Sequence, residues 1–211
     1  MANHTGPIIG KSAGVRATTL YVHGLFMTGA EGFVLLRRLR NHGVACRRFC
    51  YESRRESPDD TVERLASRLA ADPALNLVGH SLGGVISAVA VAKSPGWRGR
   101  AVLLGPPLAG SDTARRAAQL PGGRWLLGRG GRYLAGAPEA VAGSSRVLVI
   151  AGVRNVGIGR LIGACASPGD GQVRLAETAL SGAMHDDVRR GHLALVFDRR
   201  VARMTADFLL A

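Results

Sequence analysis

Short apolar runs alternate with amphipathic stretches along the chain from Thr18 onward. Runs rich in apolar and β-branched residues predict strands at residues 18–23, 44–51, 74–78, 101–104 and 146–151, with a weaker sixth around Val188. Apolar residues at helical spacing predict helices at residues 30–41, 57–71, 82–92 and 199–210. Apolar strands that alternate with helices are typical of a parallel sheet covered on both faces. The pattern therefore predicts an α/β fold with a mostly parallel central sheet.

Residues 105–145 interrupt this pattern because glycine and proline are dense there. We expect one helix near residues 111–120 and irregular segments after it. The stretch is too short for a large cap domain. Its large apolar residues either form a rim or small lid or pack onto the sheet; they are Trp125, Leu126, Leu127, Tyr133 and Leu134. Since no repeat or linker divides the chain, we expect one domain over residues 1–211, with a flexible or loosely packed segment at residues 1–16.

The chain has 211 residues and a formal net charge of +13, which could indicate a nucleic-acid partner. Only Lys11 and Lys93 among the 28 basic residues are lysines, and the arginines are dispersed as pairs with few aromatic residues between them. Nucleic-acid modules instead gather basic residues in a recognisable motif. We therefore expect no specific nucleic-acid partner. The charge is consistent with a GC-rich genome and with peripheral attraction to anionic membrane surfaces.

Three cysteines, Cys46, Cys50 and Cys165, are too few for a disulfide framework. The first two lack the nearby histidines of a metal site. No apolar run approaches the length of a membrane-spanning helix, and the polar N-terminus lacks the apolar core of a secretory signal. We therefore expect a cytoplasmic protein without metal or cofactor, and leave the oligomeric state open.

The clearest candidate for chemistry is the sequence GHSLGG at residues 79–84, between the third predicted strand and the apolar helix that follows it. In this context G-x-S-x-G is typical of a nucleophile elbow, whose serine occupies a sharp, strained turn. Gly79 and Gly83 leave room for the strand and the helix to cross closely. Ser81 is thereby predicted to project above the carboxyl end of the sheet, where open α/β folds place their sites.

A second element, HGLF at residues 23–26, follows the first predicted strand. In proteins with a nucleophile elbow, this loop supplies half of an oxyanion hole. We expect the backbone N–H groups of Leu25 and Leu82 to bind a tetrahedral oxyanion. His23 and Gly24 are expected to order the loop, with His23 bonded to the backbone and not acting as a base.

In this order and spacing, HGLF and GHSLGG resemble the α/β-hydrolase superfamily, especially its small bacterial lipase-like and esterase-like members. The resemblance covers nearly the whole chain, from Thr18 to Ala211. It implies a serine hydrolase in which an acid and then a histidine follow the serine along the chain. The motifs are specific for the superfamily and say little about the substrate.

The resemblance also indicates where the histidine belongs, namely after the last strand and just before the final helix. His192 occupies that place and is the expected general base. His185 is the alternative. His80, locked beside the serine, is expected to be a packing residue with its polar atoms satisfied.

The acid is implied in the loop after the next-to-last strand. Asp170, in the turn-rich sequence SPGDG, occupies that loop and resembles the Asp-Gly loop of the superfamily. Glu177, which lies nearby, and Asp112, which would place the acid one strand earlier, are the alternatives.

Together these residues favour hydrolysis of carboxylic esters through an acyl-enzyme on Ser81, because a serine becomes nucleophilic only beside a base that an acid orients. Thioester, amide and acyl-transfer chemistry remain alternatives on the same fold. A non-catalytic binding protein on a hydrolase scaffold is another alternative, and the charge alone would suggest a polyanion-binding protein. The expected partner is a small-molecule ester or lipid substrate.

Overall fold

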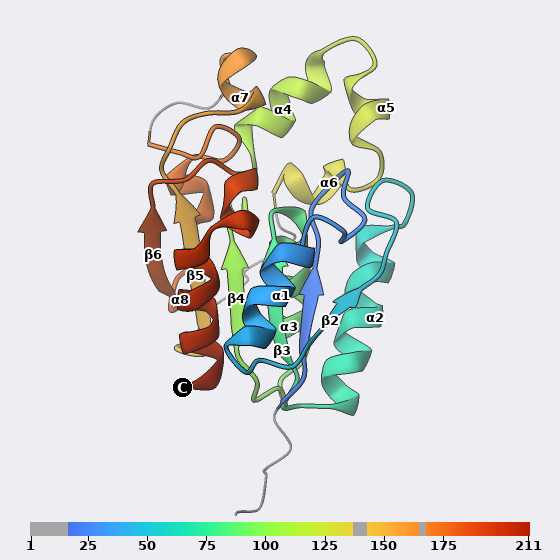
Figure 1. Ribbon diagram of the computed structural model, residues 1–211. Coiled ribbons are helices and arrows are strands. Elements are labelled where there is room, and N and C mark those ends of the chain that lie inside the picture. Colours follow the sequence, from blue (N-terminus) through green and yellow to red (C-terminus); the bar gives the residue numbers. More distant parts are fainter. Residues whose placement is uncertain (1–16, 137–142, 165–167) are drawn as a thin grey trace, which may run out of the picture.

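The computed structural model of the chain describes residues 17–136, 143–164 and 168–211. Six strands form one sheet in the order β2-β1-β3-β4-β5-β6, and every neighbouring pair is parallel (Figure 1). The strands are β1 (Thr19–Val22), β2 (Cys46–Phe49), β3 (Asn76–His80), β4 (Ala101–Leu104), β5 (Val147–Gly152) and β6 (Met184–Val188). The prediction of a parallel α/β sheet is confirmed.

Two pairs of helices cover the two faces of the sheet. Helix α1 (Phe33–Asn41) packs beside α8 (Arg199–Leu210) in front of the sheet in Figure 1, and α2 (Pro58–Ala71) packs beside α3 (Leu82–Ala92) behind it. The shorter elements are α4 (Asp112–Gln119), α5 (Gly123–Leu127), α6 (Gly131–Leu134), α7 (Ile158–Leu161) and the 3₁₀ helices η1 (Leu175–Thr178) and η2 (Leu193–Phe197). Helices α4, α5 and α7 lie above the carboxyl ends of the strands, where a site is expected (Figure 1).

The sheet divides the interior into two apolar cores because successive strand residues point to opposite faces. On β3, Leu77 packs into the core beneath α2 and α3, and Val78 into the core beneath α1 and α8. On β4, Leu103 and Val102 divide in the same way. Burial on both faces explains why these strands are continuously apolar in the sequence.

Strand β3 begins two residues later than predicted, at Asn76. Residues 72–75 form a turn instead, in which the Asp72 carboxylate accepts the Ala74 N–H (3.2 Å) and the Asp72 carbonyl accepts the Leu75 N–H (3.0 Å). This local hydrogen bonding competes with strand pairing. The strand also runs two residues further than predicted, to His80, and ends directly at Ser81.

The glycine-rich stretch is more regular than predicted, since α5 and α6 follow the expected helix α4. Some of its large apolar residues pack into the interior, and others lie at the surface. Leu127, Tyr133 and Leu134 are buried, whereas Trp125 is 77% and Leu126 48% exposed. Residues 137–142 of the stretch lie outside the described residues, as does the N-terminal segment 1–16 that we expected to be flexible.

Candidate active site

Ser81 stands at the junction between β3 and α3 in a backbone conformation that side chains rarely adopt, with φ 55° and ψ −122°. Such conformations cost about 1–3 kcal/mol and persist only where the surroundings impose them. Hydrogen bonds hold both sides of the turn: the Ser81 N–H donates to the Leu104 carbonyl (2.9 Å), and the Ser81 carbonyl accepts the Gly84 N–H (2.8 Å). This is the strained strand-to-helix geometry that the G-x-S-x-G pattern predicts.

The glycines around Ser81 are required by close backbone contacts. A Cβ on Gly83 would lie 2.1 Å from the Val22 carbonyl oxygen, and a Cβ on Gly79 would lie 2.6 Å from the Gly83 carbonyl oxygen. Both distances are far below van der Waals contact. Helix α3 can therefore begin against the ends of β1 and β3 only because both positions lack a side chain.

His23 and Tyr51 hold the loop after β1 by reciprocal contacts. The Tyr51 hydroxyl donates to the His23 carbonyl (2.6 Å), and His23 Nε2 lies 3.1 Å from the Tyr51 carbonyl oxygen. The two rings stack at a centroid distance of 4.2 Å, and His23 Nδ1 lies 3.0 Å from the Gly24 carbonyl oxygen. Burial raises the pKa of Tyr51 far above its usual value, so its hydroxyl remains a donor. His23 therefore bonds to the backbone, as expected.

This loop lies directly beside the serine. A Cβ on Gly24 would be 3.2 Å from Ser81 Cβ, and one on Gly130 would be 3.0 Å from side-chain atoms of both Leu25 and Leu82. In the described part of the chain, neither the Leu25 nor the Leu82 N–H donates a hydrogen bond. The side chains of Leu25 and Leu82 thus meet at Gly130, and neither backbone N–H has a partner among the described residues. No contact tests the role itself, which stays a prediction.

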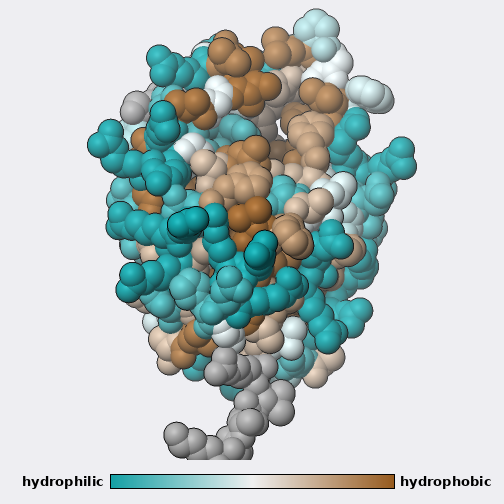
Figure 2. Space-filling model, viewed as in Figure 1, coloured by the Kyte–Doolittle hydropathy of each residue, from teal (hydrophilic) through white to brown (hydrophobic). Residues whose placement is uncertain are grey.

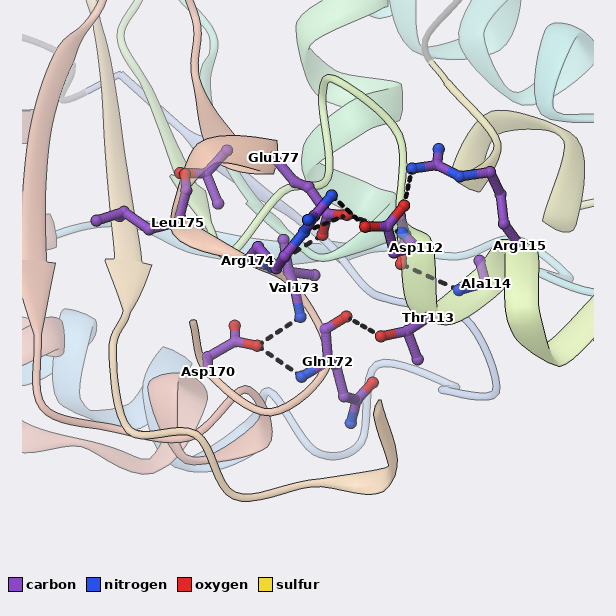
Figure 3. A network of polar contacts seen from close by, with 12 residues as sticks. Asp112, Thr113, Ala114, Arg115, Asp170, Gln172, Val173, Arg174, Leu175 and Glu177 are labelled. Atoms are coloured by element: carbon purple, nitrogen blue, oxygen red, sulfur yellow. Dashed lines mark hydrogen bonds and ion pairs between the residues drawn. The ribbon is translucent and has the colours of Figure 1, made fainter. Parts of the chain in front are cut away.

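Asp170 and His192 form a buried pair. His192 Nδ1 lies 2.6 Å from Asp170 Oδ2, and the two residues are 4% and 1% exposed. The Val173 and Gln172 N–H groups donate to Asp170 Oδ1 (2.8 and 3.0 Å), which Figure 3 shows. Burial raises the pKa of the Asp170 carboxyl, but the His192 imidazole and the amide donors outweigh burial, so that the net pKa lies below its usual value. Asp170 is therefore an ionised acceptor that holds the proton on His192 Nδ1.

His80 is fully buried beside this pair, with its ring centroid 4.9 Å from that of His192. Its Nε2 lies 3.2 Å from the His192 carbonyl oxygen; because a carbonyl only accepts, the His80 proton belongs on Nε2. Burial, followed by the proximity of His192, lowers the pKa of His80 to about 3. His80 is thus a neutral, buried packing residue, as predicted, but the prediction that it is fully satisfied is wrong, because its Nδ1 has no partner among the described residues.

The acid–histidine pair stands over the end of β4, the strand next to β3. A Cβ on Gly105, which follows β4 with a φ of +56°, would lie 3.1 Å from Asp170 Oδ2 and 3.2 Å from His192 Nδ1. The Ser81 hydroxyl makes no hydrogen bond within the described residues. Nucleophile–base hydrogen bonds are often long in unliganded sites and tighten with substrate. The structure thus brings Asp170 and His192 into contact and places Ser81 at the neighbouring strand end.

The alternative candidates have other partners. The buried Glu177 carboxylate accepts the Asp112 and Arg174 N–H groups (2.8 Å each), and the Asp112 carboxylate pairs with Arg174. His185, on β6, places its Nε2 3.1 Å from a main-chain carbonyl oxygen. Among the described contacts, none of these alternatives bonds to His192.

Sequence reasoning missed three residues of this site. Tyr51 and Gly105 lie just beyond the carboxyl ends of β2 and β4, so the rule that sites form at that edge could have identified them. Thr113, whose hydroxyl donates to the Gln172 carbonyl (2.6 Å), connects α4 to the acid loop. No sequence pattern signals that contact.

Over residues 17–136, 143–164 and 168–211, no three His, Cys, Asp or Glu side chains gather where they could hold a metal ion. No described helix is both long and apolar enough to cross a membrane. Cys46 is a buried free thiol and Cys50 an exposed one, while Cys165 lies outside the described residues.

Comparison with known proteins relates this geometry to a fold. No protein-family model and no curated protein matches the chain. Among solved structures, the mature lipase BlEst2 of Bacillus licheniformis has a TM-score of 0.68 and 17% identity, covering 97% of this chain and 96% of that one. The carboxylesterase CesB of Bacillus subtilis has a TM-score of 0.58 and 13% identity, covering 94% and 85%.

A variant of CumD, a meta-cleavage product hydrolase of Pseudomonas fluorescens, is also similar, with a TM-score of 0.61, 14% identity and coverage of 91% and 90%. At such low sequence identities a structural match shows the fold and does not identify the substrate. With its six parallel strands and its serine at the β3–α3 turn, the chain has the α/β-hydrolase fold of these bacterial lipases and esterases, without a large cap domain.

Proposed function

We propose that this protein is a serine hydrolase that cleaves carboxylic esters through an acyl-enzyme on Ser81. Three features support the proposal: the strained backbone of Ser81, the Asp170–His192 contact of 2.6 Å, and the Leu25 and Leu82 N–H groups, which donate no hydrogen bond within the described residues. The Asp170–His192 contact carries most weight, because a carboxylate that accepts from Nδ1 leaves Nε2 of the same ring as a base. The similar lipase and carboxylesterase structures favour an ester substrate.

In this proposal the Ser81 hydroxyl attacks the ester carbonyl while His192 Nε2 takes its proton. The Leu25 and Leu82 N–H groups stabilise the oxyanion of the tetrahedral intermediate. The intermediate collapses, His192 returns the proton to the leaving alcohol, and an acyl-serine remains. Water then attacks the acyl-serine with the same base, which releases a carboxylic acid and restores Ser81.

The direct test is hydrolysis of p-nitrophenyl esters of increasing chain length, together with labelling by a fluorophosphonate. Ser81→Ala should abolish both activities in a folded protein. Ser67→Ala is the matched control, because the Ser67 hydroxyl lies exposed on α2 and donates to the Glu63 carbonyl of the same helix (2.9 Å). Full hydrolysis by Ser81→Ala would overturn the mechanism. Preference for short chains would indicate an esterase, and a rise with long chains a lipase.

Other acyl chemistries on this fold need a wider substrate panel. Thioesters, amides and acyl transfer to alcohols use the same nucleophile and base, and one structurally similar protein is a meta-cleavage product hydrolase. A panel containing these substrates decides among them by kcat/KM. A protein that binds substrates without turnover and resists the fluorophosphonate would instead support the non-catalytic alternative.

The end of the molecule that carries the candidate site presents exposed apolar side chains. Figure 2 shows them gathered at the top, over α4 and α7. Exposed apolar residues in the loops after β1, α4, β5 and β6 and in α5 and α7 include Phe26, Leu120, Trp125, Leu126, Val156, Ile158, Leu161 and Leu193. Apolar side chains at this end, on a chain of net charge +13, support a proposed attraction to anionic lipid surfaces.

Vesicle sedimentation tests this attraction. We expect binding to vesicles that contain phosphatidylglycerol, weaker binding to pure phosphatidylcholine, and a loss of binding as salt rises. Leu161→Ser, which changes a side chain that is 86% exposed, should weaken binding without changing stability. Equal binding to both vesicle types would exclude an electrostatic contribution.

We also propose a cytoplasmic location. The unpaired thiols of Cys46 and the exposed Cys50 support it, because exposed thiols persist in reducing compartments. Fractionation of cells that express the protein with its own N-terminus tests the location.

A further inference from the structure

A chain of hydrogen bonds leads from helix α4 to the carboxylate of Asp170. The Thr113 hydroxyl donates to the Gln172 carbonyl (2.6 Å), and the Val173 N–H donates to Asp170 Oδ1 (2.8 Å). The Gln172 carbonyl and the Val173 N–H belong to one peptide group. Thr113 therefore acts on Asp170 through a single polarisable unit, and Figure 3 shows both bonds.

A second set of contacts keeps Thr113 in place. The Glu177 carboxylate, only 4% exposed, accepts the N–H of Asp112 at the first turn of α4 (2.8 Å) and the Arg174 N–H (2.8 Å). The Arg174 guanidinium also pairs with the Asp112 carboxylate. Since Asp112 precedes Thr113 in the helix, these bonds set the distance from α4 to the acid loop.

We infer that Thr113 is a positioning residue for Asp170, which it orients and polarises through the Gln172–Val173 peptide. The inference rests on the proposed function in treating Asp170 as the acid of the site. A hydrogen bond to a peptide carbonyl makes the N–H of the same peptide a stronger donor, by about 10–30% per bond. The Thr113 hydroxyl thus strengthens the Val173 donation that stabilises the Asp170 charge.

The predicted consequence has a definite sign. Donors to Asp170 withdraw negative charge from the carboxylate, so they weaken its attraction for the proton on His192 Nδ1. Without the Thr113 hydroxyl this withdrawal is weaker, and Asp170 Oδ2 becomes a stronger acceptor for that proton. The other ring against His192 is His80, which burial keeps neutral. The resonance of the proton between His192 Nδ1 and Asp170 should therefore move to lower field.

Thr113→Val tests the inference because it removes the hydroxyl and keeps the shape. We expect kcat to fall about fivefold with KM unchanged, the loss corresponding to one hydrogen bond. Thr113→Ser should restore kcat. Thr178→Val is the matched control: the Thr178 hydroxyl donates to the Leu175 carbonyl (2.8 Å) and, among the described contacts, makes none with Asp170. It should lower stability and leave kcat unchanged.

A readout that does not depend on turnover separates this inference from the proposed function. In protein labelled with ¹⁵N-histidine, the Nδ1 proton between His192 and Asp170 should give a low-field resonance that disappears in His192→Gln. Thr113→Val should move that resonance and Thr178→Val should not. If Thr113→Val behaves like Thr178→Val, the inference is overturned. If no substrate is turned over but the resonance still moves, the inference stands and the proposed function fails.

Discussion

The two halves of the candidate site are built by different physical means. The serine half is a continuous piece of chain, and close backbone approach shapes it, since Gly83 leaves no room for a Cβ beside the Val22 carbonyl. The other half joins Asp170 and His192 across 22 residues by hydrogen bonds of 2.6 Å between side chains and 2.9 Å between main chains. A steric requirement can be recognised in the sequence as glycines at fixed spacing. A hydrogen-bonded pair can be recognised only by its residue types, because its members lie far apart in the chain.

The same difference predicts how each half fails. A change at a glycine of the serine half should destabilise the fold, because backbone overlap is relieved only when the backbone itself shifts. A polar change in the acid–histidine half should leave the fold intact and remove chemistry. Four experiments test this contrast, in order of decreasing expected effect.

The largest effect is expected for Asp170→Asn. The Asn amide would present a donor or a weaker acceptor to His192 Nδ1. His192 would then no longer be held in the tautomer that carries its proton on Nδ1, while the fold remained. An analogous loss in another triad lowers kcat about 10⁴-fold, and we expect a similar loss for ester hydrolysis. Glu177→Gln is the control, since that buried carboxylate bonds to α4 and not to His192. A greater loss of kcat in Glu177→Gln would instead identify Glu177 as the acid.

Gly83→Ala should destabilise the protein by at least about 3 kcal/mol, because the new Cβ would overlap the Val22 carbonyl oxygen and the backbone would have to shift. Gly96→Ala is the matched control, since nothing lies within 4 Å of a Cβ built there. It should change stability by less than about 0.5 kcal/mol. Urea unfolding of both variants measures the difference, and equal stabilities would contradict a sterically built serine half.

His80→Gln should flatten the dependence of stability on pH. Burial lowers the pKa of His80 in the folded protein to about 3, so below the unfolded value near 6.5 only the unfolded state takes up the proton. Stability from this group is complete above about pH 6.5 and declines towards pH 3, with a slope of up to about 1.4 kcal/mol per pH unit. Gln can still donate to the His192 carbonyl but does not titrate. Urea unfolding between these limits should show a shallower slope in the variant; parallel slopes would contradict a neutral, buried His80.

Tyr51→Phe should have the smallest effect, about 1 kcal/mol of stability and about a fivefold fall in kcat, because it removes the bond that holds the loop beside Ser81. Tyr21→Phe is the control. Tyr21 lies on β1 and donates to the Glu31 carboxylate (3.0 Å), at the end of the same loop that adjoins α1. It should lose comparable stability and keep its kcat. If both variants keep full activity, the Tyr51–His23 contact serves stability alone.

The sequence predicted most of the fold, because strand and helix periodicities are local. It placed α3 and α8 at their observed bounds and β4 likewise. It missed the turn at Asp72, where a carboxylate competes for backbone N–H groups, and the short helices α5 and α6, where glycine hides the helical pattern. It could choose Asp170 over Glu177 only by resemblance, since both carboxylates are buried in the same loop.

The sequence by itself determined that Ser81 occupies a strained turn between a strand and a helix. Glycine is the only residue that permits such close backbone approach, and its positions can be read directly from the sequence. Only the tertiary structure decided which carboxylate meets His192, that His80 is kept neutral beside it, and that Thr113 reaches the acid loop. Those relations depend on distances between residues far apart in the chain, and the alternation of apolar and polar positions does not encode such distances.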